Sequence, residues 1–233
     1  MSIAFNGSSS HITMPAGFFN YERTQPWSVA CCIYFTKAKS GVLYGAAIFS
    51  TMNASAPNAG IEIGLLWTGT SISPNNKLLT NVQLVNNFGG GNRISKYGNT
   101  DISGSSWVHL AATYDGSSTA AGVTTYINGV ADGVGGSADA LSASIITTAT
   151  RTLGARNASS ERFAGEMQQF GAWDAVLNTD EVNSLAKGFS PRSVRPQSLI
   201  ASAPLIRDII DIKGNALTAT NTSVGTTSPR IYA

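Results

Sequence analysis

The chain has 233 residues and a formal net charge of +2, and only 12% of its residues are charged. This low charge excludes the strong basic field on which a dedicated nucleic-acid-binding protein depends. Abundant Gly, Ser, Thr, Asn and Ala favour short strands with tight turns over a helix bundle. Because all-β sandwiches of this length often form one domain, we expect one core with an appendage.

Charge is distributed unevenly along the chain. Six basic and two acidic residues from Lys187 onward give +4, which leaves −2 for residues 1–186. The first residues lack the basic and apolar regions of a secretion signal, and no later stretch is long enough to span a bilayer. We therefore expect synthesis in a cytoplasm, with neither a membrane nor nucleic acid as a partner.

Strands are predicted wherever apolar and polar residues alternate with a period of two. The clearest is 27–35, within which Cys31 and Cys32 point to opposite faces and are expected to be buried thiols rather than a disulfide. Glycine-rich loops are expected at 86–92 and 131–138. Trp107 and Trp173 are expected to be mostly buried. Further strands are predicted at 45–51, 61–67, 78–85, 107–114, 122–127, 150–153 and 163–173.

One hairpin and one helix are marked by their end residues. Asn128-Gly129 is the dipeptide that best tolerates positive φ at both centres of a type I′ turn. A short helix is predicted near 179–187, where Asn178 can cap the start and Gly188 can close the end. All other regular structure is expected to be β.

Four segments carry a resemblance to a known family by their order and spacing: WVHLAATYDG (107–116), YING (126–129), LG (153–154) and FAGEMQQF (163–170). Together with the helix that follows, they resemble the laminin G-like domain of the concanavalin A-like lectin/glucanase superfamily. Phe5-Asn6-Gly7 is similar to the family's first-strand motif. The resemblance implies an all-β, antiparallel jelly-roll β-sandwich over residues 1–190.

Residues 191–233 are predicted to form an extended C-terminal strap. Segment 204–218 resembles the one that ordinarily precedes the first strand in such domains, so the order looks circularly shifted. We therefore expect residues 217–222 to pair beside 3–5. The strap is rich in Leu and Ile, so its apolar side chains are expected to be buried by the sandwich or by a neighbouring subunit.

No catalytic residue is predicted. The family includes glucanases, and retaining hydrolysis needs two carboxyl groups flanking the bond. Glu62 and Glu166 are each expected to lack a carboxylate partner, so the protein is predicted not to be an enzyme, and Gln at either position should leave its activity intact. His11 and His109 supply neither a zinc cluster nor a triad, and His109 is expected to be a hydrogen-bonded strand residue.

No cofactor or metal site is predicted either. Some relatives bind calcium through loop oxygens, and Asp115, Asp132 and Asp139 lie in expected loops, although turn formation is the commoner role of Asp. The run Gly89-Gly90-Gly91 lacks the strand–turn–helix setting of a phosphate loop.

Sugar binding requires an exposed aromatic ring beside polar groups. Trp67 and Phe88 precede glycine-containing segments and are the candidates, with packing at the rim as the alternative interpretation for both. No ligand-binding residue is assigned beyond these two.

Two functions are expected. The first is a non-catalytic virion structural protein of a tailed bacteriophage, such as a capsid decoration or cement protein, made in the host cytoplasm and assembled on the virion surface. Its partners would be the major capsid protein or tail components, and further copies of itself. The second is a carbohydrate-binding module for adhesion or host recognition, with a glycan as ligand. We rank the first ahead, because a lone module without a secretion signal suits virion assembly.

Overall fold

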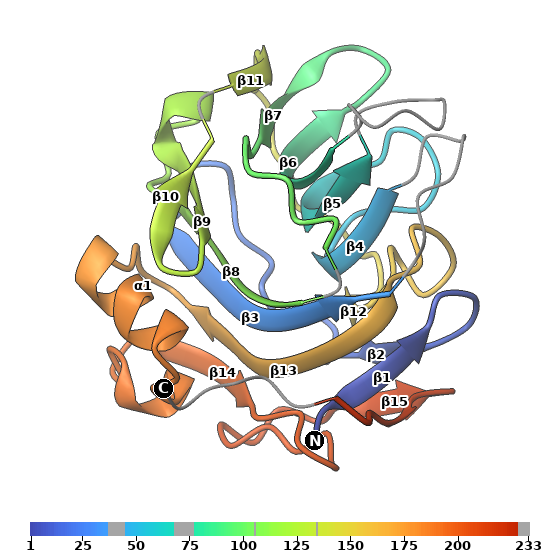
Figure 1. Cartoon of the computed structure of the whole chain (residues 1–233). Coiled ribbons are helices and arrows are strands. Elements are labelled where there is room, and N and C mark those ends of the chain that lie inside the picture. The colour runs from blue at the N-terminus through green and yellow to red at the C-terminus, as the bar shows by residue number, and fades with distance from the viewer. Residues whose placement is uncertain (37–44, 68–76, 105, 134, 228–233) are drawn as a thin grey trace.

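A computed structural model describes residues 1–36, 45–67, 77–104, 106–133 and 135–227. Two antiparallel sheets of eight strands face each other and enclose the main core (Figure 1). The alternation of apolar and polar residues explains this arrangement, since each sheet turns one apolar face inward. The antiparallel β-sandwich expected from the sequence is confirmed.

The first sheet, called sheet A, has β3 and β13 at its centre. Its order is β10-β9-β8-β3-β13-β1-β16, and β14 pairs separately with β13. The strands of sheet A are β1 (Ile3–Asn6), β3 (Trp27–Phe35), β8 (Trp107–Tyr114), β9 (Val123–Ile127), β10 (Val130–Asp132), β13 (Ala164–Trp173), β14 (Leu199–Ala203) and β16 (Ser223–Val224).

The second sheet, called sheet B, carries the strands that matter most for function. Its order is β11-β7-β6-β5-β4-β12-β2-β15. The strands of sheet B are β2 (His11–Thr13), β4 (Gly45–Ser50), β5 (Gly60–Trp67), β6 (Leu78–Asn87), β7 (Asn92–Tyr97), β11 (Gly135–Asp139), β12 (Thr152–Leu153) and β15 (Thr218–Thr220).

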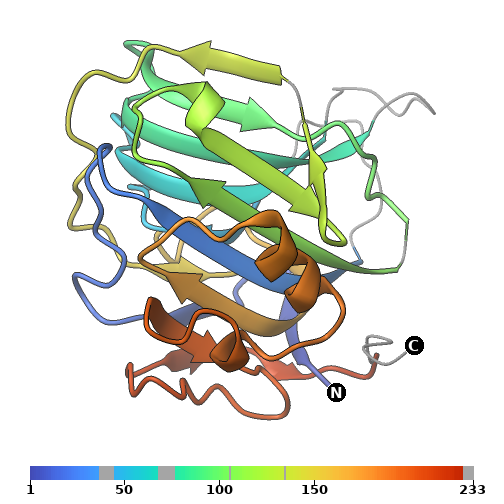
Figure 2. The same cartoon turned by 90° about the vertical axis from the view of Figure 1, so that its left-hand side faces the viewer.

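The predicted helix is α1 (Thr179–Ala186), and two 3-10 turns, η1 (Ala120–Gly122) and η2 (Pro191–Ser193), accompany it. Asn178 accepts from the Glu181 backbone N–H while the Glu181 side chain accepts from the Asn178 backbone N–H, which closes a capping box. Val182 and Leu185 are buried in a second apolar cluster with Trp173. Helix α1 thus packs on the outer face of sheet A, across its strands in Figure 2.

The two tryptophans that were expected to be mostly buried are buried to different degrees. Trp173 is fully buried, as expected. Trp107 is mostly buried as well, but less completely than Trp173. The reason is its position in β8, where Val108 and Leu110 point into the core and Trp107 therefore points outward, beside the ring of Tyr34 at 5.8 Å.

The expected loop at 131–138 is also wrong, because most of it belongs to the edge strands β10 and β11. β11 pairs with β7 through a glycine-rich backbone, which keeps its ladder hydrogen bonds without needing large side chains. The expected loop at 86–92 is shorter than predicted, since β6 continues to Asn87 and β7 starts at Asn92. The turn at Asn128-Gly129 has φ of 50° and 84°, as a type I′ turn requires.

The C-terminal strap adds strands to both sheets of the same chain. β14 pairs with β13, β15 with β2, and β16 with β1. The expected pairing of 217–222 beside 3–5 is therefore wrong by one strand, since 223–224 takes that place. Asn221, with φ of 51°, lies between β15 and β16, where the chain leaves one sheet for the other.

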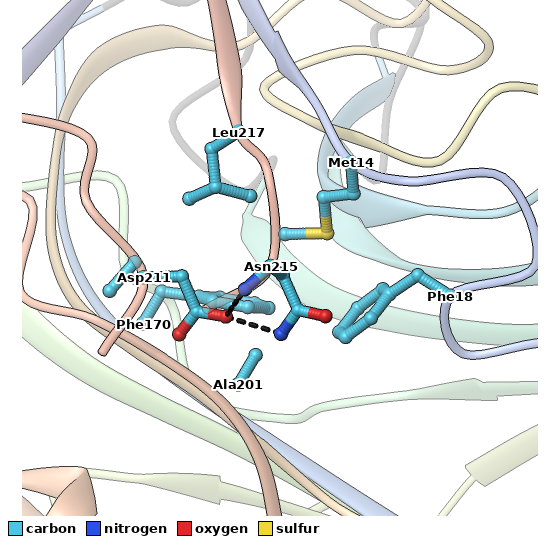
Figure 3. Close-up of a pocket in the computed structure, with 8 residues that line it drawn as sticks. Met14, Phe18, Phe170, Ala201, Asp211, Asn215 and Leu217 are labelled. Carbon is cyan, nitrogen blue, oxygen red and sulfur yellow. Dashed lines mark hydrogen bonds between the residues drawn. The ribbon is translucent and has the colours of Figure 1, made fainter. Parts of the chain in front are cut away.

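The strap is anchored over a small apolar hollow that leaves no room for a water molecule (Figure 3). Met14, Phe18 and Leu217 are among its lining residues. The Asp211 carboxylate accepts from the backbone N–H groups of Ser202, at 2.6 Å, and of Asn215, at 3.2 Å. This hollow is therefore a packing site.

Burial of the strap's apolar side chains within this chain is incomplete. Leu199 and Leu205 are buried at 4% and 0% exposure. Ile206, Ile210 and Ile212 remain exposed at 39%, 65% and 47%, because they lie on the loop between β14 and β15 rather than in a strand. Only part of the strap's apolar surface is thus used within this chain.

Candidate functional site

A row of polar side chains crosses the outer face of sheet B. Ser50, Glu62, Gln83 and Ser95 are directly opposite one another on β4, β5, β6 and β7. All four side chains are buried. Since their strand neighbours point into the core, this row points away from the core, and burial of so many polar groups outside a core requires an explanation.

A cavity of about 290 Å³ lies over this face, and we call it the sheet B pocket. Strands β5 and β6 form its floor, and the start of β4, the turn after β6 and the segment between β12 and β13 form its walls. Its lining residues are Gly45, Asn58, Glu62, Leu65, Leu66, Asn81, Gln83, Phe88, Arg156 and Glu161.

Arg156 ties two carboxylates together at one wall of the pocket. Its Nε donates to Glu62 Oε2 at 2.7 Å and its terminal NH2 group donates to Glu62 Oε1 at 2.5 Å. A second terminal nitrogen lies 3.8 Å from Glu161 Oε1. Burial would lower the pKa of Arg156, but the hydrogen bond and charge of Glu62, with the charge of Glu161, raise it instead.

Glu161 lies farther from the Arg156 guanidinium than Glu62 does. Burial raises the pKa of its carboxyl, the charge of Glu62 adds to this, and Arg156 opposes it. Its carboxylate lies directly over Gly45, where any β-carbon would collide with it. The absence of a side chain at Gly45 therefore lets Glu161 reach the pocket.

Two amide side chains in the floor carry unpaired polar atoms. Asn81 and Gln83 are only 5% and 8% exposed, yet Asn81 Oδ1 and Gln83 Oε1 have no hydrogen-bond partner among the residues that the structure describes. An unpaired buried polar atom costs about 1–3 kcal/mol. Exchanging the oxygen and nitrogen of either amide would put an unpaired nitrogen in the same place. The missing hydrogen bond therefore does not depend on how the amide is oriented. Both atoms are poised to bond a ligand in the sheet B pocket.

Phe88 gives the pocket an aromatic edge. It is 40% exposed, and its backbone N–H donates to the Pro57 carbonyl at 2.9 Å. The Arg93 guanidinium lies 4.0 Å from the centre of the ring. Of the two aromatic candidates from the sequence, Phe88 thus lines the pocket, whereas Trp67 is 3% exposed and belongs to the core.

The carboxylates expected to stand alone have different surroundings. Glu62 does have a carboxylate nearby, because the loop after β12 brings Glu161 to the same arginine, and the sequence-based expectation is wrong here. The Glu166 carboxylate, on sheet A, accepts from the Ser2 hydroxyl and the Thr227 backbone N–H. Glu166 therefore has a structural role in holding the two ends of the chain.

The histidines are far apart in the fold, one on β2 and the other on β8. His109 is 7% exposed, and burial lowers its pKa to about 4. As expected, it is a hydrogen-bonded strand residue, since its backbone N–H donates to Asn128 Oδ1 at 2.9 Å and its carbonyl oxygen accepts from the Asn128 backbone N–H at 2.8 Å. Its ring Nδ1 lacks a hydrogen-bond partner among the described residues. His11 Nδ1 lies 3.0 Å from the Ser9 carbonyl oxygen and 3.1 Å from an Arg162 nitrogen.

The two thiols lie away from the sheet B pocket, on β3. Cys31 and Cys32 are both free, and they point to opposite faces as expected. Burial raises the pKa of both, that of Cys32 to about 12. Both are therefore protonated and unreactive at neutral pH.

The aspartates considered for calcium accept hydrogen bonds from backbone amides. Asp115 accepts from Ser117 at 2.8 Å, Asp132 from Thr100 at 3.0 Å and Asp139 from Ala120 at 2.7 Å. Only the Asp115 contact, two residues along the chain, is the turn-forming role expected of Asp. Asp132 and Asp139 lie in β10 and β11 rather than in loops, and each holds a segment that is distant in the chain. Within the described ranges, no three His, Cys, Asp or Glu side chains gather closely enough to hold a metal ion.

Two further sequence features have simple structural outcomes. The glycines at 89–91 form the turn between β6 and β7, where the Gly90 backbone N–H donates to the Asn87 side chain at 2.9 Å, and they precede no helix. In the part of the chain that the structure covers, no helix is sufficiently long and apolar to cross a membrane.

Solved structures with the same fold include proteins of several kinds. A native heptameric SAP-like pentraxin from Limulus polyphemus has a TM-score of 0.58 at 16% identity, with 96% of this chain and 94% of that chain covered. A putative carbohydrate binding protein from Bacteroides ovatus has a TM-score of 0.58 at 15% identity, over 97% of this chain and 62% of that one. The CBM40 of a Ruminococcus gnavus IT-sialidase has a TM-score of 0.54 at 12% identity, over 79% and 96%.

At these identities the likeness concerns the fold. Among curated protein sequences, none matches the chain. The family model described as "Concanavalin A-like lectin/glucanases superfamily" matches residues 6–183, which include every strand of the sandwich except β1's first residues and the strap. The chain therefore belongs to the concanavalin A-like lectin/glucanases superfamily.

Proposed function

We propose that this protein is a non-catalytic carbohydrate-binding module and that the sheet B pocket is its glycan site. The observation that carries the proposal is the pair of unpaired buried acceptors, Asn81 Oδ1 and Gln83 Oε1, in the floor of a pocket with an aromatic edge. Sugar hydroxyls can donate to both atoms, and the apolar face of a sugar ring can pack against Phe88. A ligand would thus repay the cost of leaving these amides unpaired.

Proteins with the same fold support this choice without deciding it. One is described as a putative carbohydrate binding protein and another as a CBM40. Their low identity to this chain means that the side chains of the sheet B pocket, and not the fold, carry the argument.

Hydrolysis is the second candidate, because Glu62 and Glu161 flank one arginine and the pKa of Glu161 is raised, as in a general acid. The arrangement of Arg156 argues against it. Both oxygens of Glu62 accept hydrogen bonds from that guanidinium, which stabilises the carboxylate and makes it a weaker nucleophile. Incubation of a bound oligosaccharide with the protein should release no reducing sugar, and release that Glu161→Gln abolishes would favour an enzyme.

The virion role stays a prediction. None of the three structures named above is described as a virion protein, and the sheet B pocket gives a specific reason to rank glycan binding first. A glycan-binding module could serve adhesion on a cell surface or on the surface of a virion. Detection of the chain in purified virions would be the direct test of that role.

Glycan-array binding of two matched variants tests the proposal. Gln83→Met keeps the length of the side chain and removes its polar atoms, so binding should fall by at least about tenfold, the effect of one or two lost hydrogen bonds. Gln168→Met is the control, because Gln168 is also a buried glutamine with an unpaired Oε1, but on sheet A. It should bind as the wild type does. If both variants bind glycan as tightly as the wild type, the sheet B pocket is not the glycan site.

A further inference from the structure

The size of the sheet B pocket limits how much of a glycan it can hold. Its volume of about 290 Å³ is at the lower end of small-molecule sites, which span about 300–1,000 Å³. It therefore has room for the end of a glycan and not for an extended chain.

The charges that line the pocket are unequal. Arg156 is the one cation among its described lining residues, and Glu62 and Glu161 are the two anions. The bidentate contact with Glu62 uses two of the Arg156 nitrogens, and the remaining terminal nitrogen faces Glu161. Arg93 is not among the lining residues; its guanidinium lies over the Phe88 ring and donates to the Phe88 carbonyl oxygen. No lining cation is left over for an anionic ligand.

The unpaired atoms in the floor of the sheet B pocket also favour a ligand that donates hydrogen bonds. Asn81 Oδ1 and Gln83 Oε1 are acceptors, and the Glu161 carboxylate can only accept while it is ionised. A ligand hydroxyl donates to such groups, whereas a ligand carboxylate brings further acceptors and a like charge. Placing like charges together in a desolvated site costs several kcal/mol.

We infer that the sheet B pocket takes the uncharged terminal sugar of a glycan and rejects acidic sugars, an inference that rests on the proposed function. Hydroxyl groups of the terminal sugar donate to Asn81 and Gln83, and its ring packs beside Phe88. Glu161 supplies the negative charge that excludes uronic and sialic acids. Arg156 is a positioning residue, because it fixes both carboxylates and contacts no ligand in this scheme.

A divalent cation between the sugar and these oxygens would be a different arrangement. Calcium takes 6–8 oxygen ligands, most often carboxylates. Both oxygens of Glu62 are already bonded to Arg156, which leaves Glu161 and the two amides as the available donors. The described residues of the pocket therefore favour direct contact with the sugar.

Matched pairs of sugars that differ only at C6 test the inference. Titration calorimetry at pH 7 in EDTA would compare galactose with galacturonic acid and glucose with glucuronic acid, each as the methyl glycoside, after an array has identified the binding series. The neutral member should bind at least about tenfold more tightly. Glu161→Gln should narrow this ratio, and Asp174→Asn, which removes an exposed carboxylate elsewhere, should leave it unchanged.

The outcomes separate the two claims. Tighter binding of the acidic member, or binding that EDTA abolishes, would overturn the inference and leave glycan binding itself standing. A ratio that Glu161→Gln leaves unchanged would overturn the assigned role of Glu161. Failure of every glycan on the array to bind would instead overturn the proposed function, and the inference with it.

Discussion

Single buried polar atoms are the most informative features of this molecule at the scale of residues. Most buried polar groups in proteins have partners, so the unpaired oxygens of Asn81 and Gln83 indicate a cost that the fold alone does not offset. Sites of function are often less stable than they could be for this reason. The same reasoning predicts that the two properties, stability and binding, will respond to substitution in opposite directions.

Gln83→Met provides the test. The change removes an unpaired polar group and keeps the volume, so the free energy of unfolding should stay the same or rise by about 1 kcal/mol while glycan binding is lost. Urea denaturation monitored by tryptophan fluorescence would measure it. A loss of more than about 1 kcal/mol would mean that Gln83 supports the fold and that its lost binding is indirect.

His109 makes stability depend on pH. Burial lowers its pKa from the ordinary 6.5 to about 4, so between these values the unfolded chain takes up a proton that the folded chain does not. The contribution of neutral His109 is therefore complete above pH 6.5 and is lost as the pH falls toward 4, by up to about 3 kcal/mol.

The pH dependence is best measured as a difference between variants. Denaturant unfolding from pH 7.5 to 4 should show a smaller loss of stability for His109→Gln than for the wild type. Parallel curves for the two proteins would show that the pKa of His109 is the same in the folded and unfolded chains, which would contradict the account.

At the scale of elements, the strands were largely predictable and the edges were not. The strands at 27–35 and 107–114 have the predicted bounds because their apolar periodicity is imposed by two packed faces. The short strands β10, β11, β15 and β16 lie at sheet edges, where few side chains are buried and the pattern is weak.

The candidate site was harder to predict than the strands around it. The sequence pointed to Phe88, but Glu62 was dismissed because its partners Arg156 and Glu161 come from a loop distant in the chain. Nothing in the local pattern of that loop indicates which sheet it will cover. Asn81 and Gln83 could have been suspected, since both are polar residues on a strand whose core-facing neighbours are apolar.

The strap offers a matched pair of substitutions. Leu205 is fully buried in the main core, so Leu205→Ala should lower the free energy of unfolding by about 2–5 kcal/mol. Ile210, from the same segment, is 65% exposed, and Ile210→Ala should change the free energy of unfolding by less than about 0.5 kcal/mol. Thermal denaturation of both variants would show whether the strap contributes to one cooperative core. Equal and small effects would mean that the strap is not part of that core.

The two outer faces of the whole molecule have different uses. Helix α1 covers part of the outer face of sheet A, where Trp173 and Leu199 are buried. The outer face of sheet B instead carries the sheet B pocket, with its polar floor and aromatic edge. The helix thus covers one sheet and the candidate ligand site lies on the other. This division suits a binding module, because the site can vary without disturbing the packing of the helix.

Nuclear magnetic resonance of the side-chain amides measures the central claim most directly. The NH2 resonances of Asn81, Gln83 and Gln168 would be followed in 15N-labelled protein during titration with the neutral glycan that binds best on the array. The account predicts saturable shifts of the Asn81 and Gln83 signals and none for Gln168, which lies on the other sheet. Saturable binding that leaves Asn81 and Gln83 unshifted would contradict it, because the glycan would then occupy another part of the molecule.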